Sequence, residues 1–203
     1  MQVAVLGPLE VSVEARSIPV SGTRLRALLL RLAVDAGRPV SGSELADAVW
    51  AANRPADEAN ALQTLVSRLR RALGDPSVLA QHGQGYRLVG VDTDVAQFYR
   101  LIELARTATS AGDLATAVTE YQRALALWRG PALDGWGEAD WALGPVARWQ
   151  DDQLAALAAR IDCEVQLGRS AQVIAELEQL CRRYPMREQF TQTLMTALAA
   201  TGR

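Results

Sequence analysis

The chain has 203 residues, of which 49% are hydrophobic and 22% charged, a composition typical of a globular protein with one large or two small domains. No stretch approaches the roughly 18 consecutive apolar residues of a membrane helix, and the N-terminal MQVAVLGPLE lacks the basic segment and apolar run of a signal peptide. These features exclude a membrane partner and predict a soluble, cytoplasmic protein.

Histidine and cysteine are scarce. His82 is the single histidine, so a metal centre or a catalytic triad would have to be built around it. Cys163 and Cys181 both fall on apolar faces of predicted helices, where reduced core residues are expected rather than a disulfide. We therefore expect no enzyme activity, no cofactor and no redox role.

Charge is divided unevenly along the chain. Residues 1–91 carry ten arginines against eight acidic residues, and residues 92–203 carry eleven against fifteen, which gives net charges of +2 and −4. Between residue 60 and the end of the first half, Asp75 is the single acidic residue among several arginines. Such a local positive excess suits phosphate contact, although a solvated charged helix accounts for it equally.

The chain begins with predicted strands and continues with a helix. Residues 2–6, 9–13 and 17–20 are short runs with β-branched residues separated by turn residues, which predicts a small antiparallel sheet. From Thr23 the apolar period becomes helical, and Gly37 is placed to end this first helix in a left-handed conformation.

Two further helices are predicted from their capping residues. Ser41 and Glu44 have the spacing of a capping box, which predicts a second helix ending near Trp50. Asp57 can cap a third helix, and Gly74 in the sequence Gly-Asp-Pro ends it. The apolar positions of the third helix recur with the helical period: Leu62, Leu65, Val66, Leu69 and Leu73.

A β-hairpin is predicted after the third helix. Residues 78–81 and 86–89 are apolar runs on either side of the turn sequence at residues 82–85. The order of sheet, three helices and hairpin is that of a helix-turn-helix with a wing.

The third helix has a polar face with the side chains that DNA-reading helices use. The positions opposite or beside the apolar stripe are Asn60, Gln63, Thr64, Ser67, Arg68, Arg70 and Arg71. Arginine can contact guanine edges or phosphates, glutamine and asparagine can contact adenine, and threonine can contact a thymine methyl group. A polar outer face is also the rule for amphipathic surface helices, so the pattern alone leaves both interpretations open.

The second half is helical and partly repetitive. Gly112, Gly168 and Gly202 each follow a predicted helix, and the last two are 34 residues apart, the period of tetratricopeptide repeats. The longer interval between the first two contains an insertion at residues 129–150 that is rich in Gly, Pro and Trp. Stacked helix pairs of this kind leave a concave groove that binds proteins.

The insertion and the last predicted helix suggest further surfaces. Trp136 and Trp141 are equally well assigned to the groove or to a cover over the core beneath the loop. The last helix carries Phe190 and Leu194 on its apolar face and ends where the partner helix of its repeat should begin. We therefore expect the natural chain to continue past Arg203.

The chain resembles a known family. LVSRLRRALG followed by GQGYRL resembles the OmpR-type winged helix, and the starting sheet fits that type. Together with DVAQFYRLIELA at residues 94–105, the whole chain resembles the SARP antibiotic-regulatory activators. This resemblance implies an α+β winged helix-turn-helix at residues 1–91 and an all-α, tetratricopeptide-like bacterial transcriptional activation domain at residues 92–203.

The resemblance also implies roles for individual residues. By position, the base-reading residues are Gln63, Thr64, Ser67 and Arg68, and the phosphate-contacting residues are Asn60, Arg70 and Arg71. His82 stands at the wing tip, where the type often carries arginine, which predicts a weaker or pH-dependent minor-groove contact. Tyr86 and Trp50 match phosphate-contacting positions but are equally expected to be packed aromatics, and Arg87 is either a DNA contact or a solvated sheet residue.

The function implied by the resemblance is transcription activation. Such a protein would bind direct repeats in double-stranded promoter DNA, associate with itself on tandem sites and recruit the RNA polymerase holoenzyme. The alternative is a helical-repeat adaptor whose winged helix serves as a protein interface.

Overall fold

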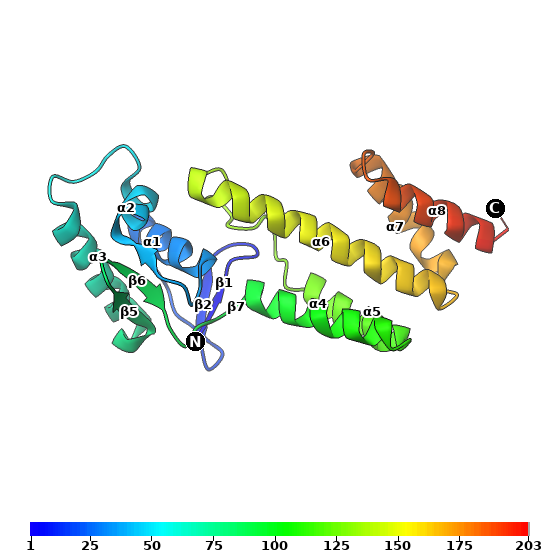
Figure 1. The fold of residues 1–203 in the computed structure, drawn as a ribbon, viewed down its shortest axis with the longest axis horizontal. Coiled ribbons are helices and arrows are strands. Elements are labelled where there is room, and N and C mark those ends of the chain that lie inside the picture. Colours follow the sequence, from blue (N-terminus) through cyan, green and yellow to red (C-terminus); the bar gives the residue numbers. More distant parts are fainter. Residues whose placement is uncertain (203) are drawn as a thin grey trace. The chain divides into compact units, whose positions relative to one another are not determined.

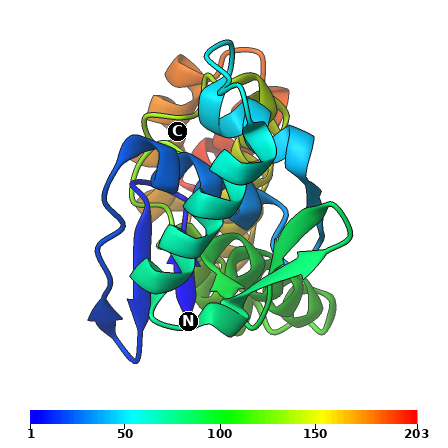
Figure 2. The same ribbon diagram turned by 90° about the vertical axis from the view of Figure 1, so that its left-hand side faces the viewer.

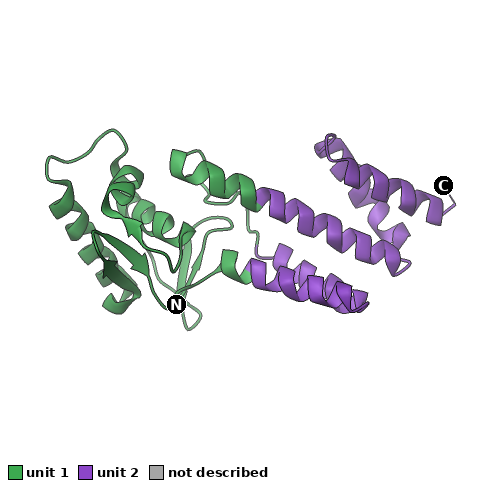
Figure 3. Ribbon diagram, viewed as in Figure 1, with its two compact units in different colours: residues 1–97, 128–149 green, residues 98–127, 150–203 purple. Residues whose placement is uncertain are grey.

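The computed structural model describes residues 1–202 and divides into two compact units (Figure 3). The first unit comprises residues 1–97 and 128–149, and the second comprises residues 98–127 and the described residues from 150 onward. Packing therefore assigns 128–149 to the same unit as the N-terminal sheet. The predicted boundary between residues 91 and 92 separates a DNA-binding part from an activation part by function rather than by packing, and it stays a prediction.

The first unit starts with a small sheet. Its strands are β1 (Gln2–Ala4), β2 (Glu10–Val13), β3 (Arg16–Ser17) and β7 (Asp92–Thr93), in the order β3-β2-β1-β7. β1 and β2 are antiparallel and pair Val3 with Val11, and both side chains are buried. β1 and β2 lie within the first two predicted runs, while β3 overlaps the third, residues 17–20, only at Ser17. The two-residue β7, which runs parallel to β1, was not predicted.

Three helices form the helix-turn-helix region: α1 (Thr23–Val34), α2 (Gly42–Trp50) and α3 (Glu58–Leu73) (Figure 1). The predicted start of α1 is confirmed, but the helix ends three residues before Gly37. The capping box of α2 is present in full, because the Ser41 side chain accepts a hydrogen bond from the Glu44 backbone N–H and the Glu44 carboxylate accepts one from the Ser41 N–H. The Ser41 hydroxyl also donates to the Glu44 carboxylate over 2.6 Å, and this bond, followed by the one from the Ser41 N–H, lowers the pKa of the Glu44 carboxyl group.

Helix α3 has the predicted caps and buried stripe. The Asp57 carboxylate accepts a hydrogen bond from the Asn60 backbone N–H, and Gly74 ends the helix in the left-handed conformation with φ +76°. All five apolar stripe residues are buried, and Leu69 is fully inaccessible. Since that stripe faces the core, the opposite face of α3 is exposed to solvent.

The wing is built from β4 (Val40–Ser41), β5 (Leu79–His82) and β6 (Gly85–Leu88), in the order β4-β6-β5, and Figure 2 draws the hairpin of β5 and β6 in green. A short 3-10 helix, η1 (Pro76–Val78), leads from α3 into β5. The predicted hairpin is confirmed, with Gly83 and Gln84 as its turn. β4 was not predicted, and it requires glycine at position 85, where a Cβ would lie 2.1 Å from the Val40 carbonyl oxygen.

The helices of the second half are α4 (Asp94–Ser110), α5 (Leu114–Leu125), α6 (Asp140–Gln166), α7 (Ser170–Arg183) and α8 (Glu188–Ala200). α4 and α6 begin in the first unit and continue in the second. Within the second unit, α6, α7 and α8 share a core that includes Ile161, Leu177 and Phe190. Both cysteines are free thiols, Cys163 buried and Cys181 partly buried. No helix among the described residues is long and apolar enough to cross a membrane.

Within the first unit, backbone hydrogen bonds join residues 128–149 to the segment that follows β1. The Arg129 N–H donates to the Leu6 carbonyl oxygen and the Leu133 N–H to that of Val5, each over 2.8 Å. Trp136 and Trp141 are half-buried in this segment. From the sequence, these tryptophans were expected either in the groove of the repeats or over the core beneath the loop. In the structure they belong to the compact unit that contains the N-terminal sheet.

Asp94 connects the sheet to α4. Its buried carboxylate accepts hydrogen bonds from the backbone N–H groups of Val5 and Leu6 over 2.8 Å and forms an ion pair of 3.3 Å with Arg129. Burial raises the pKa of the Asp94 carboxyl group, and the hydrogen bonds and Arg129 oppose that rise. A chain ending at residue 91 would lose both these contacts and β7.

Candidate nucleic-acid interface

The exposed face of α3 carries six of the seven polar residues predicted on it. They are Asn60, Gln63, Thr64, Ser67, Arg68 and Arg71. Steps of three or four residues place them along one side of the helix, opposite the buried stripe. We call this set the α3 row. The sequence prediction of which face is exposed is confirmed, while the contacts of each residue with DNA stay predictions.

Arg70 differs from its neighbours in the α3 row. It is half-buried, and its guanidinium group donates to the Leu79 carbonyl oxygen from Nε over 3.0 Å and from Nη2 over 2.6 Å. This contact ties α3 to the first residue of β5. It favours a structural role for Arg70 over the predicted phosphate contact, a distinction that the helical wheel could not make.

The arginines of the α3 row keep their positive charge uncompensated. Within the described residues, the side chains of Arg68 and Arg71 form no ion pair. The acidic residues beside the start of α3 are engaged, because Arg54 pairs with Asp47 and with Glu58. The row therefore presents a positive, hydrogen-bonding surface that suits an anionic partner.

The wing residues have different degrees of exposure. His82 is exposed at the end of β5, next to the turn, where the prediction places it. Arg87 is half-buried on β6, and its Nε atom is buried without a hydrogen-bond partner among the described residues. Tyr86 is only 6% exposed and pairs with Val40 and Gln81 across the sheet, which favours its packed alternative.

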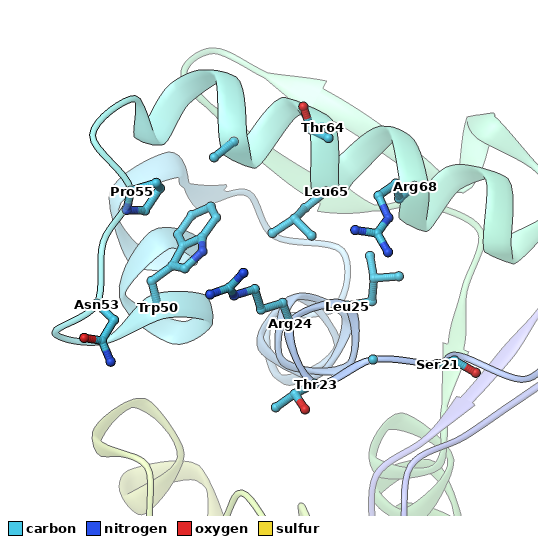
Figure 4. A pocket seen from close by; sticks show the side chains of 12 residues that line it. Ser21, Thr23, Arg24, Leu25, Trp50, Asn53, Pro55, Thr64, Leu65 and Arg68 are labelled. Atoms are coloured by element: carbon cyan, nitrogen blue, oxygen red, sulfur yellow. The ribbon is translucent and has the colours of Figure 1, made fainter.

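Trp50 ends α2 and is also largely buried, with 7% of its surface exposed. It borders a surface pocket that Arg24 of α1 and Arg68 of α3 also line (Figure 4). Arg24 was missed in the sequence, where it is one polar residue in the first turn of a predicted helix. Only the assembly of three helices brings it close to the α3 row. No cluster of metal-ligating side chains occurs in the described part of the chain.

Two family models match the chain. "Bacterial transcriptional activator domain" matches residues 93–203, and "Transcriptional regulatory protein, C terminal" matches residues 18–88. The first model alone spans more than half of the chain. The match at residues 18–88 covers the helix-turn-helix region and the wing, and the match at residues 93–203 covers the helical second half.

Individual relatives are similar over the whole chain. Transcriptional regulator RedD of Streptomyces coelicolor is 34% identical over 100% of this chain and 60% of its own length. Regulatory protein DnrI of Streptomyces peucetius is 33% identical over 100% of this chain and 79% of its own length. This chain therefore spans less than two thirds of the length of RedD and a larger share of DnrI.

A solved structure has the same fold. The structure titled Mycobacterium tuberculosis EmbR in complex with low affinity phosphopeptide matches with a TM-score of 0.94 and 31% identity. The match covers 100% of this chain and 55% of the EmbR chain. The chain thus shares its fold, a winged helix followed by a helical domain, with a protein of related sequence.

Proposed function

The chain belongs to the SARP family of antibiotic-regulatory transcription activators, and on that basis we propose that it binds promoter DNA sequence-specifically and recruits the RNA polymerase holoenzyme. The proposed target genes direct the synthesis of secondary metabolites such as antibiotics, and the proposed site of action is the cytoplasm. Residues 1–91 would supply DNA recognition and residues 92–203 the protein contacts.

The observation that carries the DNA-binding proposal is the α3 row. A helix held by a fully buried stripe, capped at both ends and lined by exposed amide, hydroxyl and unpaired arginine side chains has the features of a recognition helix in the major groove. We assign base reading to Gln63, Thr64, Ser67 and Arg68, and phosphate contact to Asn60 and Arg71. His82 at the wing tip would reach the neighbouring minor groove.

Selection of bound sequences from random duplex DNA tests this proposal. We expect the whole chain to enrich direct repeats whose centres are about 10–10.5 base pairs apart, so that two protomers lie on one face of the DNA. Recovery of inverted repeats only would contradict the tandem arrangement. A failure to enrich any sequence would contradict DNA recognition and favour the adaptor function.

Polymerase recruitment is tested by transcription in vitro from a selected site. The whole chain should raise transcript yield, and Arg71→Ala should do so equally once its concentration is increased to give the same promoter occupancy. Equal activation at equal occupancy follows if the polymerase contacts lie outside the α3 row. Repression by both proteins would contradict the activator assignment. Point variants are preferred to a fragment of residues 1–91, which would lack β7 and Asp94.

A further inference from the structure

A surface pocket of about 560 Å³ lies beside the α3 row, between the start of α1, the end of α2 and the middle of α3 (Figure 4). Leu25, Leu65 and the indole of Trp50 supply apolar parts of its wall. Arg24 and Arg68 enter it from α1 and α3, and Figure 4 shows both side chains extending into the space between these helices. The pocket is thus a concave site with a cationic lining.

The lining of this pocket contains no acidic residue, and neither arginine forms an ion pair within the described residues. A second pocket of the same unit, lined by Arg31, Arg38 and others, contains Asp35, which pairs with both of these arginines. Among the described residues Arg24 has no counter-ion, and the charge of Arg68 adds to the positive potential of the lining, so an anion beside Arg24 is stabilised. The first pocket therefore favours an anionic ligand.

The backbone adds to this preference. Gly22 and Thr23 also line the pocket, and they form the N-terminus of the 12-residue helix α1. Gly22 provides no side-chain cap and the first turn holds no acidic residue, so the N–H groups and the positive end of the helix dipole at this terminus are not satisfied by a side chain. This terminus supplements the two arginines; the charged lining is the main feature.

We propose that this pocket holds a phosphate group of the DNA backbone, with Arg24 as its principal ligand. The inference rests on the proposed DNA-binding function and adds a contact that flanks the recognition helix. Thr64 and Arg68 belong both to the α3 row and to the pocket lining. A duplex that contacts the row therefore passes the pocket mouth, whereas a small free anion would gain nothing from the rest of the row.

The test compares Arg24→Gln with Arg26→Gln in the whole chain. Both arginines are exposed on α1 and both substitutions remove one positive charge, but only Arg24 lines the pocket. Affinity for a selected duplex is measured by fluorescence anisotropy over a series of salt concentrations. We expect Arg24→Gln to weaken binding of all sequences about fivefold and to reduce the slope of log affinity against log salt by about 0.9, the value for one phosphate contact. Arg26→Gln should leave both quantities close to those of the parent chain.

Single methylphosphonate substitutions along the duplex then identify the phosphate. One substitution should weaken binding of the parent chain and have no further effect on Arg24→Gln. Equal affinities of the two variants, with the parent chain binding DNA normally, would overturn the pocket assignment and leave the proposed function intact. If the parent chain does not bind DNA at all, both the pocket assignment and the proposed function are overturned.

The source of the anion is checked with inorganic phosphate and pyrophosphate as probes. Each probe is added at constant ionic strength and at a concentration at which the duplex would saturate the protein. We expect neither probe to raise the melting temperature of the parent chain more than it raises that of Arg24→Gln. Stabilisation that depends on Arg24, combined with unchanged DNA affinity of Arg24→Gln, would overturn the DNA contact in favour of a small phosphorylated ligand. Both variants alter exposed side chains, so their melting temperatures without ligand should match that of the parent.

Discussion

Arg160 of the second unit and the arginines of the α3 row in the first unit have opposite surroundings. In the second unit, Arg160 is 9% exposed and its guanidinium group contacts Glu164 over 3.0 Å and Glu176 over 2.6 Å. In the first unit, Arg68 and Arg71 are exposed and have no acidic partner among the described residues. The partner groups around an arginine, rather than its presence in a helix, therefore distinguish a structural role from a binding role.

The largest effect is expected at the buried ion pair. Arg160→Ala leaves the carboxylate of Glu164 buried without its partner, so the free energy of unfolding should fall by about 3–5 kcal/mol. Denaturant unfolding measures this change. Arg169→Ala, which removes an exposed arginine before α7, is the control and should change stability little. Equal stability of the two variants would mean that Arg160 is not a structural residue.

Leu69→Ala tests which face of α3 is buried. The substitution opens a cavity in the core of the first unit and should lower the free energy of unfolding by about 2–5 kcal/mol. DNA affinity should be lost only under conditions where the variant unfolds. Thermal unfolding followed by circular dichroism checks the prediction, and a fully stable variant would mean that the helix face has been assigned backwards.

Arg68→Ala tests base reading by the α3 row. Loss of a base contact should weaken binding by about 1–3 kcal/mol and relax sequence preference at one position of the site. Competition between the selected duplex and its single-base variants measures both effects. If every competing sequence is weakened equally, Arg68 contacts phosphate instead of a base.

Adjacent arginines give the finest test of the comparison. Arg71→Ala should weaken binding to all sequences similarly and reduce the salt slope by about 1, because it removes a phosphate contact. Arg70→Ala should instead lower the free energy of unfolding by about 1.5–3 kcal/mol, since its charged guanidinium group holds the Leu79 carbonyl. Salt titration and denaturant unfolding of both variants separate the two roles. An exchange of these behaviours would contradict both assignments.

The features that could be predicted from the sequence are those with local signals. Ser41 with Glu44, Asp57 and Gly74 define helix ends through contacts within a few residues, and the periodic leucines define the buried face. β4 and β7 were missed because each has two residues and pairs with a strand far along the chain, whereas β3 follows its partner β2 after a short turn. The existence of β4 and β7 depends on those distant partners.

The details of the candidate site needed the folded chain for the same reason. Arg70 and Arg71 are both polar residues of the last turn of α3, and only the carbonyl of Leu79 makes one of them structural. Arg24 joins the site because α1, α2 and α3 pack together. The placement of residues 128–149 in the first unit rests on backbone hydrogen bonds to Val5 and Leu6, which leave no trace in side-chain periodicity.

Salt titration of the whole chain with a selected duplex tests whether the α3 row is a DNA-binding surface. We predict that log affinity falls linearly with log salt, with a slope of about −0.9 for each phosphate contacted. The combined Arg68→Ala and Arg71→Ala variant should show a shallower slope at unchanged thermal stability. Affinity independent of salt, or identical slopes for the parent and the double variant, would contradict DNA binding by the α3 row.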